Sequence, residues 1–162
     1  MKKCFATCAC ALLLIVAARG IPQTFQQPTN IFLRSAGVSF EEFASDPDSW
    51  DAKAGLKGHW LAHGDTLQLT ESAAVFGVAA DQITAQQKDG RVQSFRVVFH
   101  AGDRKAGKPV DIAGQLSANL RAFTGDSGTQ LAGGGAVFKY KAVTITLRPG
   151  SGREVVVEFT RS

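Results

Sequence analysis

Two of the three histidines lie close enough in the sequence to act together. His59 and His63 form an H-x-x-x-H pattern, and Asp65 follows two residues later. Side chains at that spacing share one face of a helix or of a strand, where two imidazoles could hold a metal ion or supply a base. Zinc needs a third protein ligand; Asp65 lies close by, but no third ligand follows at a characteristic spacing. The alternative is a pair of solvated histidines beside a turn, because Gly64 favours a turn.

A second short pattern, Gly125-Asp126-Ser127-Gly128, resembles the serine-bearing loop of chymotrypsin-like proteases, with His63 in the histidine position. The resemblance covers four residues and a loosely placed histidine. Those enzymes need a pair of β-barrels to bring nucleophile, base and acid together, and this chain is too short for them. The pattern therefore predicts a helix end at Gly125 and a turn after it.

Two groups of residues are candidates for binding. Arg104, Lys105 and Lys108 form a basic cluster on a predicted loop, where they could attract an anionic surface. Trp50 and Trp60 flank a Gly-containing segment and could form a surface platform for a sugar or a peptide. The alternatives are a solvated basic loop and two buried tryptophans.

The N-terminus has the pattern of an export signal. Lys2 and Lys3 precede an unbroken apolar run over residues 9–18, and cleavage could follow Ala18 or Gly20. A helix of about ten residues spans about 15 Å, which is half of a hydrocarbon core of about 30 Å. We therefore expect residues 1–20 to be a signal peptide, the mature chain to be periplasmic or extracellular, and no stable membrane anchor to remain.

Removal of that segment changes the charge and the thiol content of the chain. The full sequence has 18 basic and 14 acidic side chains, and the loss of Lys2, Lys3 and Arg19 leaves 15 against 14. Such a balance does not predict a nucleic-acid partner. All the cysteines lie in the same segment (Cys4, Cys8 and Cys10), so the mature chain has no disulfide.

Turn and periodicity signals divide the remainder into a spacer over residues 21–37 and one domain over 38–162. Strands are expected at 58–62, 66–70, 83–88, 91–99, 136–147 and 154–160, with a tight turn at Asp89-Gly90. The main amphipathic helix is expected at about 111–124, because residues 112, 116, 120 and 123 form one apolar stripe. Shorter helices are expected near 39–45, 48–54 and 71–76.

These elements predict an α+β fold: an antiparallel sheet of four to six strands, with the main helix and the shorter helices on one face. The order of elements from residue 71 onward also fits tandem αββ units. No cofactor motif is present. The sequence therefore favours a secreted or periplasmic, non-enzymatic binding or interaction module over an enzyme, with another extracytoplasmic protein as its partner. The alternative is a small metal-dependent or histidine-dependent hydrolase that uses His59, His63 and Asp65.

Overall fold

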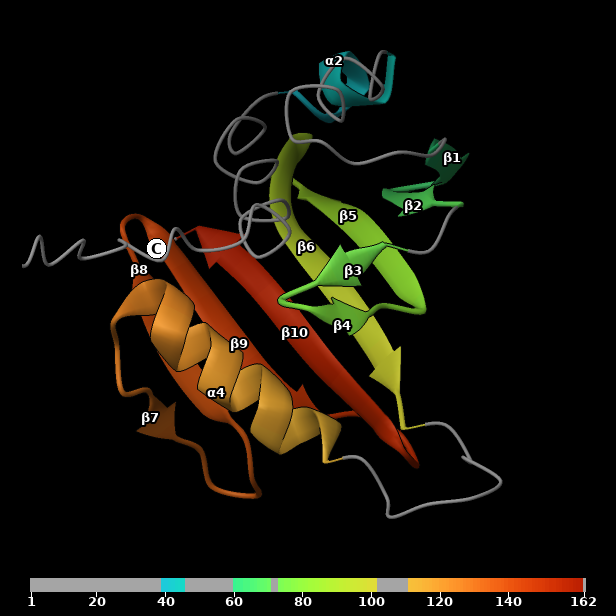
Figure 1. Cartoon of the computed structure of the whole chain (residues 1–162). Coiled ribbons are helices and arrows are strands. Elements are labelled where there is room, and N and C mark those ends of the chain that lie inside the picture. The colour runs from blue at the N-terminus through green and yellow to red at the C-terminus, as the bar shows by residue number, and fades with distance from the viewer. Residues whose placement is uncertain (1–38, 46–59, 71–72, 102–110, 162) are drawn as a thin grey trace, which may run out of the picture.

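A computed structural model describes residues 39–45, 60–70, 73–101 and 111–161 (Figure 1). The expected signal peptide, the spacer, the helix expected at 48–54 and the basic loop at 102–110 lie outside these residues. The signal peptide and the domain limits therefore stay predictions.

The described part of the chain is mostly β-sheet. Eight strands form one antiparallel sheet in the order β1-β2-β5-β6-β10-β9-β8-β7 (Figure 1). Their bounds, in that order, are Trp60–His63, Thr66–Leu69, Gln82–Lys88, Arg91–His100, Glu154–Arg161, Val143–Pro149, Ala136–Tyr140 and Thr129–Gln130. Strands β3 (Ala74–Val75) and β4 (Val78–Ala79) form a separate two-stranded sheet. The helices described are α2 (Phe40–Ser45) and α4 (Ile112–Thr124).

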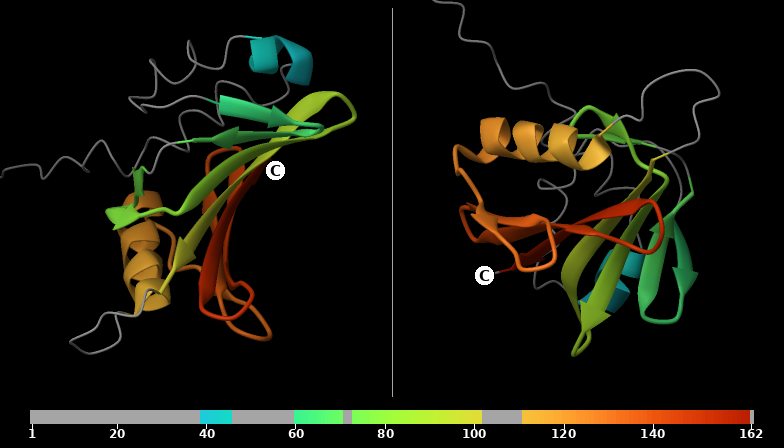
Figure 2. Two further views of the ribbon diagram at one scale, coloured as in Figure 1. Left: turned by 90° about the vertical axis from the view of Figure 1, so that its right-hand side faces the viewer. Right: turned by 90° about the horizontal axis from the view of Figure 1, so that it is seen from below.

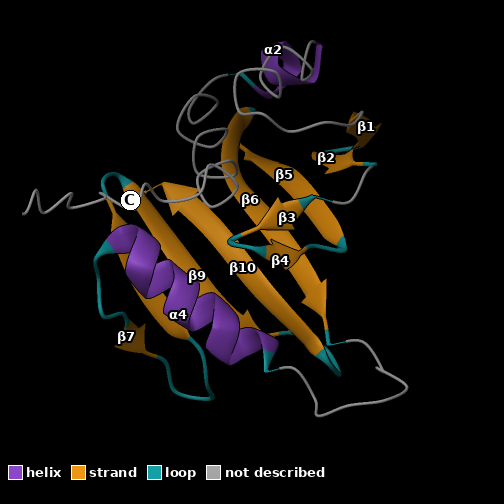
Figure 3. Cartoon of the chain, viewed as in Figure 1, coloured by secondary structure: helices purple, strands orange, loops and turns teal. Residues whose placement is uncertain are grey.

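The predicted α+β fold with four to six strands and several helices on one face is therefore wrong. One long helix lies against a large, strongly twisted sheet, as Figures 2 and 3 show. Part of the error comes from residues 136–147, which were expected to be one strand. They form two strands, because Lys141 adopts a left-handed φ of 54° and the chain reverses there, pairing Tyr140 with Val143.

The helix predicted at 71–76 is also wrong over its described part. Ala74 and Val75 form β3, and the next two residues, Phe76 and Gly77, have φ values of 51° and 73°. Positive φ at both central positions defines a two-residue hairpin turn and is incompatible with a helix. Without this helix, the tandem αββ arrangement is wrong as well.

The hairpin predicted at Asp89-Gly90 is confirmed. Both residues have positive φ, 54° and 71°, and they join β5 to β6. The helix expected at about 111–124 is present as α4. The Asp111 side chain caps its first turn by accepting from the Gly114 amide at 2.9 Å, and Gly125 ends it with a φ of 72°.

One face of the sheet carries the core. Alternate residues of the strands point toward α4 and the β3–β4 hairpin, which cover this face (Figure 2). Phe76 at the hairpin tip packs between Phe123 of α4 and Phe159 of β10, with ring centroids 5.6 and 5.9 Å away. These aromatic contacts fix the helix over the sheet, and α4 in turn lies against β8 and β9.

Candidate functional site

The predicted histidine cluster is described only in part. His63 ends β1 as an exposed residue paired with Thr66, and Gly64 turns the chain with a φ of 57°. The Asp65 carboxylate accepts a 2.6 Å hydrogen bond from the Gln87 side-chain amide. His59 lies outside the described residues. Within the described ranges, no group of three or more His, Cys, Asp or Glu side chains is placed to hold a metal ion.

Trp60 belongs to the core. It is 8% exposed, and its ring meets Phe43 of α2 and Phe95 of β6 edge to face, with centroids 6.0 and 6.2 Å away. Its ring therefore serves the packing of α2 on the sheet instead of forming an exposed platform. The other predicted binding residues, Trp50, Arg104, Lys105 and Lys108, lie outside the described part of the chain.

The protease-like loop has a structural role. The Asp126 carboxylate accepts from the backbone amides of Gly128 at 2.9 Å and Lys139 at 2.8 Å. These hydrogen bonds lower the pKa of Asp126 below its ordinary value, and the bond from Gly128 has the larger effect. His63 lies on β1, at the opposite edge of the sheet from this loop, so the histidine and Ser127 are not brought together.

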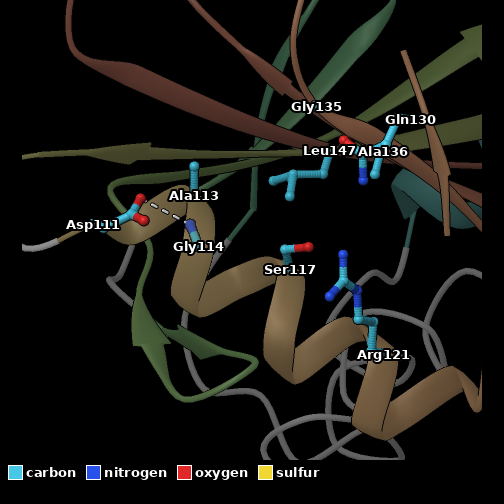
Figure 4. Close-up of a pocket in the computed structure, with 9 residues that line it drawn as sticks. All are labelled: Asp111, Ala113, Gly114, Ser117, Arg121, Gln130, Gly135, Ala136 and Leu147. Carbon is cyan, nitrogen blue, oxygen red and sulfur yellow. Dashed lines mark hydrogen bonds between the residues drawn. The ribbon is translucent and has the colours of Figure 1, made fainter. Parts of the chain in front are cut away.

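A pocket of about 290 Å³ lies between α4 and the strands at this edge of the sheet (Figure 4). We name it the α4 pocket. Helix residues form one wall, and residues of β7, β8 and β9 with their connecting turn form the other. The lining residues are Asp111, Ala113, Gly114, Ser117, Arg121, Gln130, Gly135, Ala136 and Leu147.

Two polar side chains of α4 reach into the α4 pocket from the same side. Ser117 and Arg121 are four residues apart, so they share one face of the helix, beside the buried Leu116 and Leu120. Figure 4 shows the Arg121 guanidinium extending from α4 toward the strands, with the Ser117 side chain on the same wall and its hydroxyl on the side of Arg121. Burial of the two leucines sets the rotation of α4 and thereby aims both polar groups.

The opposite wall depends on one glycine. Gly135 has a φ of 92°, and a Cβ at this position would collide with the Leu147 carbonyl oxygen of β9. Only glycine therefore allows the chain to enter β8 so close to β9. This close approach places Ala136 and Leu147 as the apolar floor of the α4 pocket, with Gln130 of β7 at its rim (Figure 4).

Within the part of the chain that the structure describes, the polar groups of the α4 pocket make no other polar contacts, with one exception. Among the described residues, the side chains of Ser117, Arg121 and Gln130 have no hydrogen-bond or ion-pair partner. Asp111 differs, because its carboxylate already accepts the Gly114 amide at the start of α4. The pocket therefore presents a cation, a hydroxyl and a carboxamide over an apolar floor, which suits ligand binding more than acid–base chemistry.

A second charged cluster lies where β6 ends and β10 begins. The imidazole of His100 is 3.2 Å from the Asp81 carboxylate through Nδ1 and 3.1 Å from the Glu154 carboxylate through Nε2. The hydrogen bond from the Ser151 hydroxyl, 2.8 Å long, is the largest cause of a lowered pKa at Glu154. This cluster joins three chain segments, so we assign it a structural role.

The sequence predicted neither the α4 pocket nor the charged cluster around His100. The i, i+4 spacing of Ser117 and Arg121 beside the apolar stripe was a visible signal for one wall of the α4 pocket. Nothing local links them to Gln130 or Leu147, because the strand order decides that contact.

Among the described residues, no helix has the length and apolar character needed to span a membrane. No protein-family model matches the chain, and neither the curated proteins nor the solved structures contain a significant match.

Proposed function

We propose that the chain is exported and acts outside the cytoplasm as a non-enzymatic binding module, with the α4 pocket as its ligand site. Export rests on the basic and apolar pattern of residues 1–20. The observation that carries the binding role is the convergence of Ser117, Arg121 and Gln130 on one apolar-floored pocket. A ligand or the exposed end of another extracytoplasmic protein would fill this site.

The scaffold suits such a role. Both walls of the α4 pocket belong to packed secondary structure: α4 is fixed by Leu116, Leu120 and Phe123, and the strand wall by pairing of β7, β8 and β9. Because the backbone of both walls is already ordered, the entropy lost on binding is confined to the side chains that contact the ligand. The groups in the pocket donate hydrogen bonds and offer apolar contact, and these are the interactions of recognition.

The test is recovery of a ligand. The purified chain is incubated with an extract of extracytoplasmic small molecules and analysed by native mass spectrometry. Ala113→Trp fills the α4 pocket from an exposed helix position, and Ala118→Trp is the matched control on the same helix outside the lining. We expect a ligand that is recovered with the mass it has in the extract. It should bind the Ala118→Trp variant and fail to bind the Ala113→Trp variant. Equal binding to both variants, or recovery of a chemically altered compound, contradicts the proposal.

Export has its own test. Expression of residues 1–162 in a bacterial host should yield a chain whose N-terminus begins after Ala18 or Gly20 and which is found outside the cytoplasm. Replacement of Leu13 and Leu14 by Asp should leave an uncut chain in the cytoplasm, because the apolar run is interrupted. A chain cut normally in that variant would refute the export assignment.

A further inference from the structure

We infer that the α4 pocket binds a carboxylate carried on a small apolar body, and that Arg121 holds the carboxylate. This inference rests on the proposed function, since it assigns a ligand class to the same pocket. It follows from the charge, the donor geometry and the size of the site.

The charge of the lining favours a ligand with one negative charge. Among the lining residues that the structure describes, Arg121 is the one cationic side chain and Asp111 is the one anionic side chain. The Asp111 carboxylate is held at the helix start by the Gly114 amide, whereas the guanidinium has no partner among the described residues. A single carboxylate would pair with Arg121. A dianion such as phosphate would add a second negative charge that no other described lining side chain balances, and the Asp111 carboxylate disfavours that extra charge.

The donors match a carboxylate. The planar guanidinium presents parallel N–H groups that a carboxylate accepts in a two-pronged pair. Ser117 lies one helical turn before Arg121 on the same wall with its hydroxyl on the side of Arg121, and Gln130 of β7 lines the opposite wall (Figure 4). A carboxylate has about four lone-pair positions, so two guanidinium N–H groups and two further donors can satisfy it.

The size and the apolar lining define the rest of the ligand. The volume of about 290 Å³ lies just below the range of about 300–1,000 Å³ that is usual for ligand pockets, so the ligand is small. Ala113, Ala136 and Leu147 provide methyl contacts but no further charge. The ligand is therefore a short apolar body with one acidic end. A free carboxylic acid and the C-terminal residue of an apolar peptide share this chemistry.

The experiment compares acid with amide. Binding of N-acetyl-leucine and of its neutral analogue N-acetyl-leucinamide is followed by NMR chemical-shift titration of the purified chain. Acetyl-Ala-Ala-Leu with a free C-terminus represents the peptide source, and inorganic phosphate at pH 8 represents a dianion. We expect the acid to shift resonances of Ser117, Arg121 and Ala136, and to bind at least about tenfold more tightly than the amide.

Arginine variants locate the effect. Arg121→Gln should weaken acid binding about tenfold or more. Arg121→Lys should retain part of the affinity, because lysine keeps the positive charge but lacks the paired N–H groups of the guanidinium. Arg148→Gln is the matched control: it removes the same charge, and Arg148 pairs with Glu158 at 3.2 Å outside the α4 pocket. The Arg148→Gln variant should bind the acid with the same affinity as the unchanged chain. Arg121 is exposed, so its variants should fold, which the thermal midpoint verifies.

The outcomes separate this inference from the proposed function. Preference for the tripeptide or for the single residue identifies the source of the carboxylate, and either result supports the inference. Equal binding of acid and amide, tighter binding of phosphate, or an unchanged affinity in Arg121→Gln overturns it. Ligand recovery that is blocked by Ala113→Trp would still support the binding role in that case.

Discussion

The side-chain amide of Asn119 donates a 2.6 Å hydrogen bond to the carbonyl oxygen of Phe76. This bond joins the middle of α4 to the tip of the β3–β4 hairpin, two elements that are far apart in the sequence. The Phe76 ring is fully buried against Phe123 and Phe159, so the hydrogen bond and the aromatic contacts act at the same point. The relationship explains why a short two-stranded sheet stays attached to the helix.

Asn119→Ala tests this attachment. Removal of the amide leaves the Phe76 carbonyl without its donor in a partly buried position, so the free energy of unfolding should fall by about 1–3 kcal/mol. Gln115→Ala, one turn earlier at an exposed position, is the control and should change stability little. Urea denaturation measures both, and equal stability of the two variants would remove the structural role assigned to Asn119.

Asp126 links stability to pH. Because the amides of Gly128 and Lys139 lower the pKa of the folded carboxylate below that of the unfolded chain, the ionised form stabilises the fold. This contribution is complete above the unfolded pKa, about 4, and disappears as the pH falls through the lower folded pKa. Asp126→Asn should therefore lower the thermal midpoint at pH 7, and the difference from the unchanged chain should shrink toward pH 2. A constant difference across this range would show that the carboxylate charge has no role.

The glycines of the α4–β8 connection allow a matched comparison. Gly128 and Gly133 have similar φ values of 78° and 87°, but a Cβ on Gly128 would lie 2.5 Å from the Phe138 ring, whereas one on Gly133 meets nothing within 4 Å. Both alanine variants incur the strain of a left-handed backbone, of about 1–2 kcal/mol. Gly128→Ala should be destabilised further by the clash with buried Phe138. Calorimetry that ranks Gly133→Ala as the less stable variant would contradict the described packing.

The fold could be predicted from the sequence where the signal was local. Asp89-Gly90 supports positive φ at two successive residues, and the apolar stripe between Asp111 and Gly125 defines α4. The segment around Ala73 and Ala74 has helix-forming residues, but Phe76 adopts a left-handed conformation because its ring is buried between aromatic residues from α4 and β10. Tertiary packing overrides the local helix propensity at this position, and no local sequence pattern predicts the left-handed conformation of Phe76.

The candidate site shows the same division. Ser117 and Arg121 share a helix face that spacing alone identifies, but Gln130, Ala136 and Leu147 reach them only through the order of β7, β8 and β9 at the sheet edge. The residues chosen from the sequence were histidines, tryptophans and clustered charges, which are chemically conspicuous. Of these, Trp60 entered the core, and the Asp65 carboxylate bonded to Gln87.

The end of the sheet near His100 should be stabilised by its two carboxylate contacts. His100→Ala removes the imidazole that bridges Asp81 and Glu154. The adjacent backbone bonds, from the Ala101 amide to Arg153 and from the Asp81 amide to Val98, should then open more often. Because half-exposed ion pairs contribute little, we expect amide hydrogen exchange at Ala101 and Asp81 to rise by up to about fivefold. Unchanged exchange at both amides would show that the bridge does not hold these segments together.

The central claim, that a small carboxylate occupies the α4 pocket, is tested most directly by intermolecular nuclear Overhauser effects. With isotope-labelled methyl groups in the chain and unlabelled N-acetyl-leucine, the ligand methyls should show contacts to the methyls of Ala113, Ala136 and Leu147. These contacts should disappear in Arg121→Gln at the same ligand concentration and persist in Arg148→Gln. Contacts confined to other residues, or pocket contacts that survive the loss of the Arg121 guanidinium, would contradict the account.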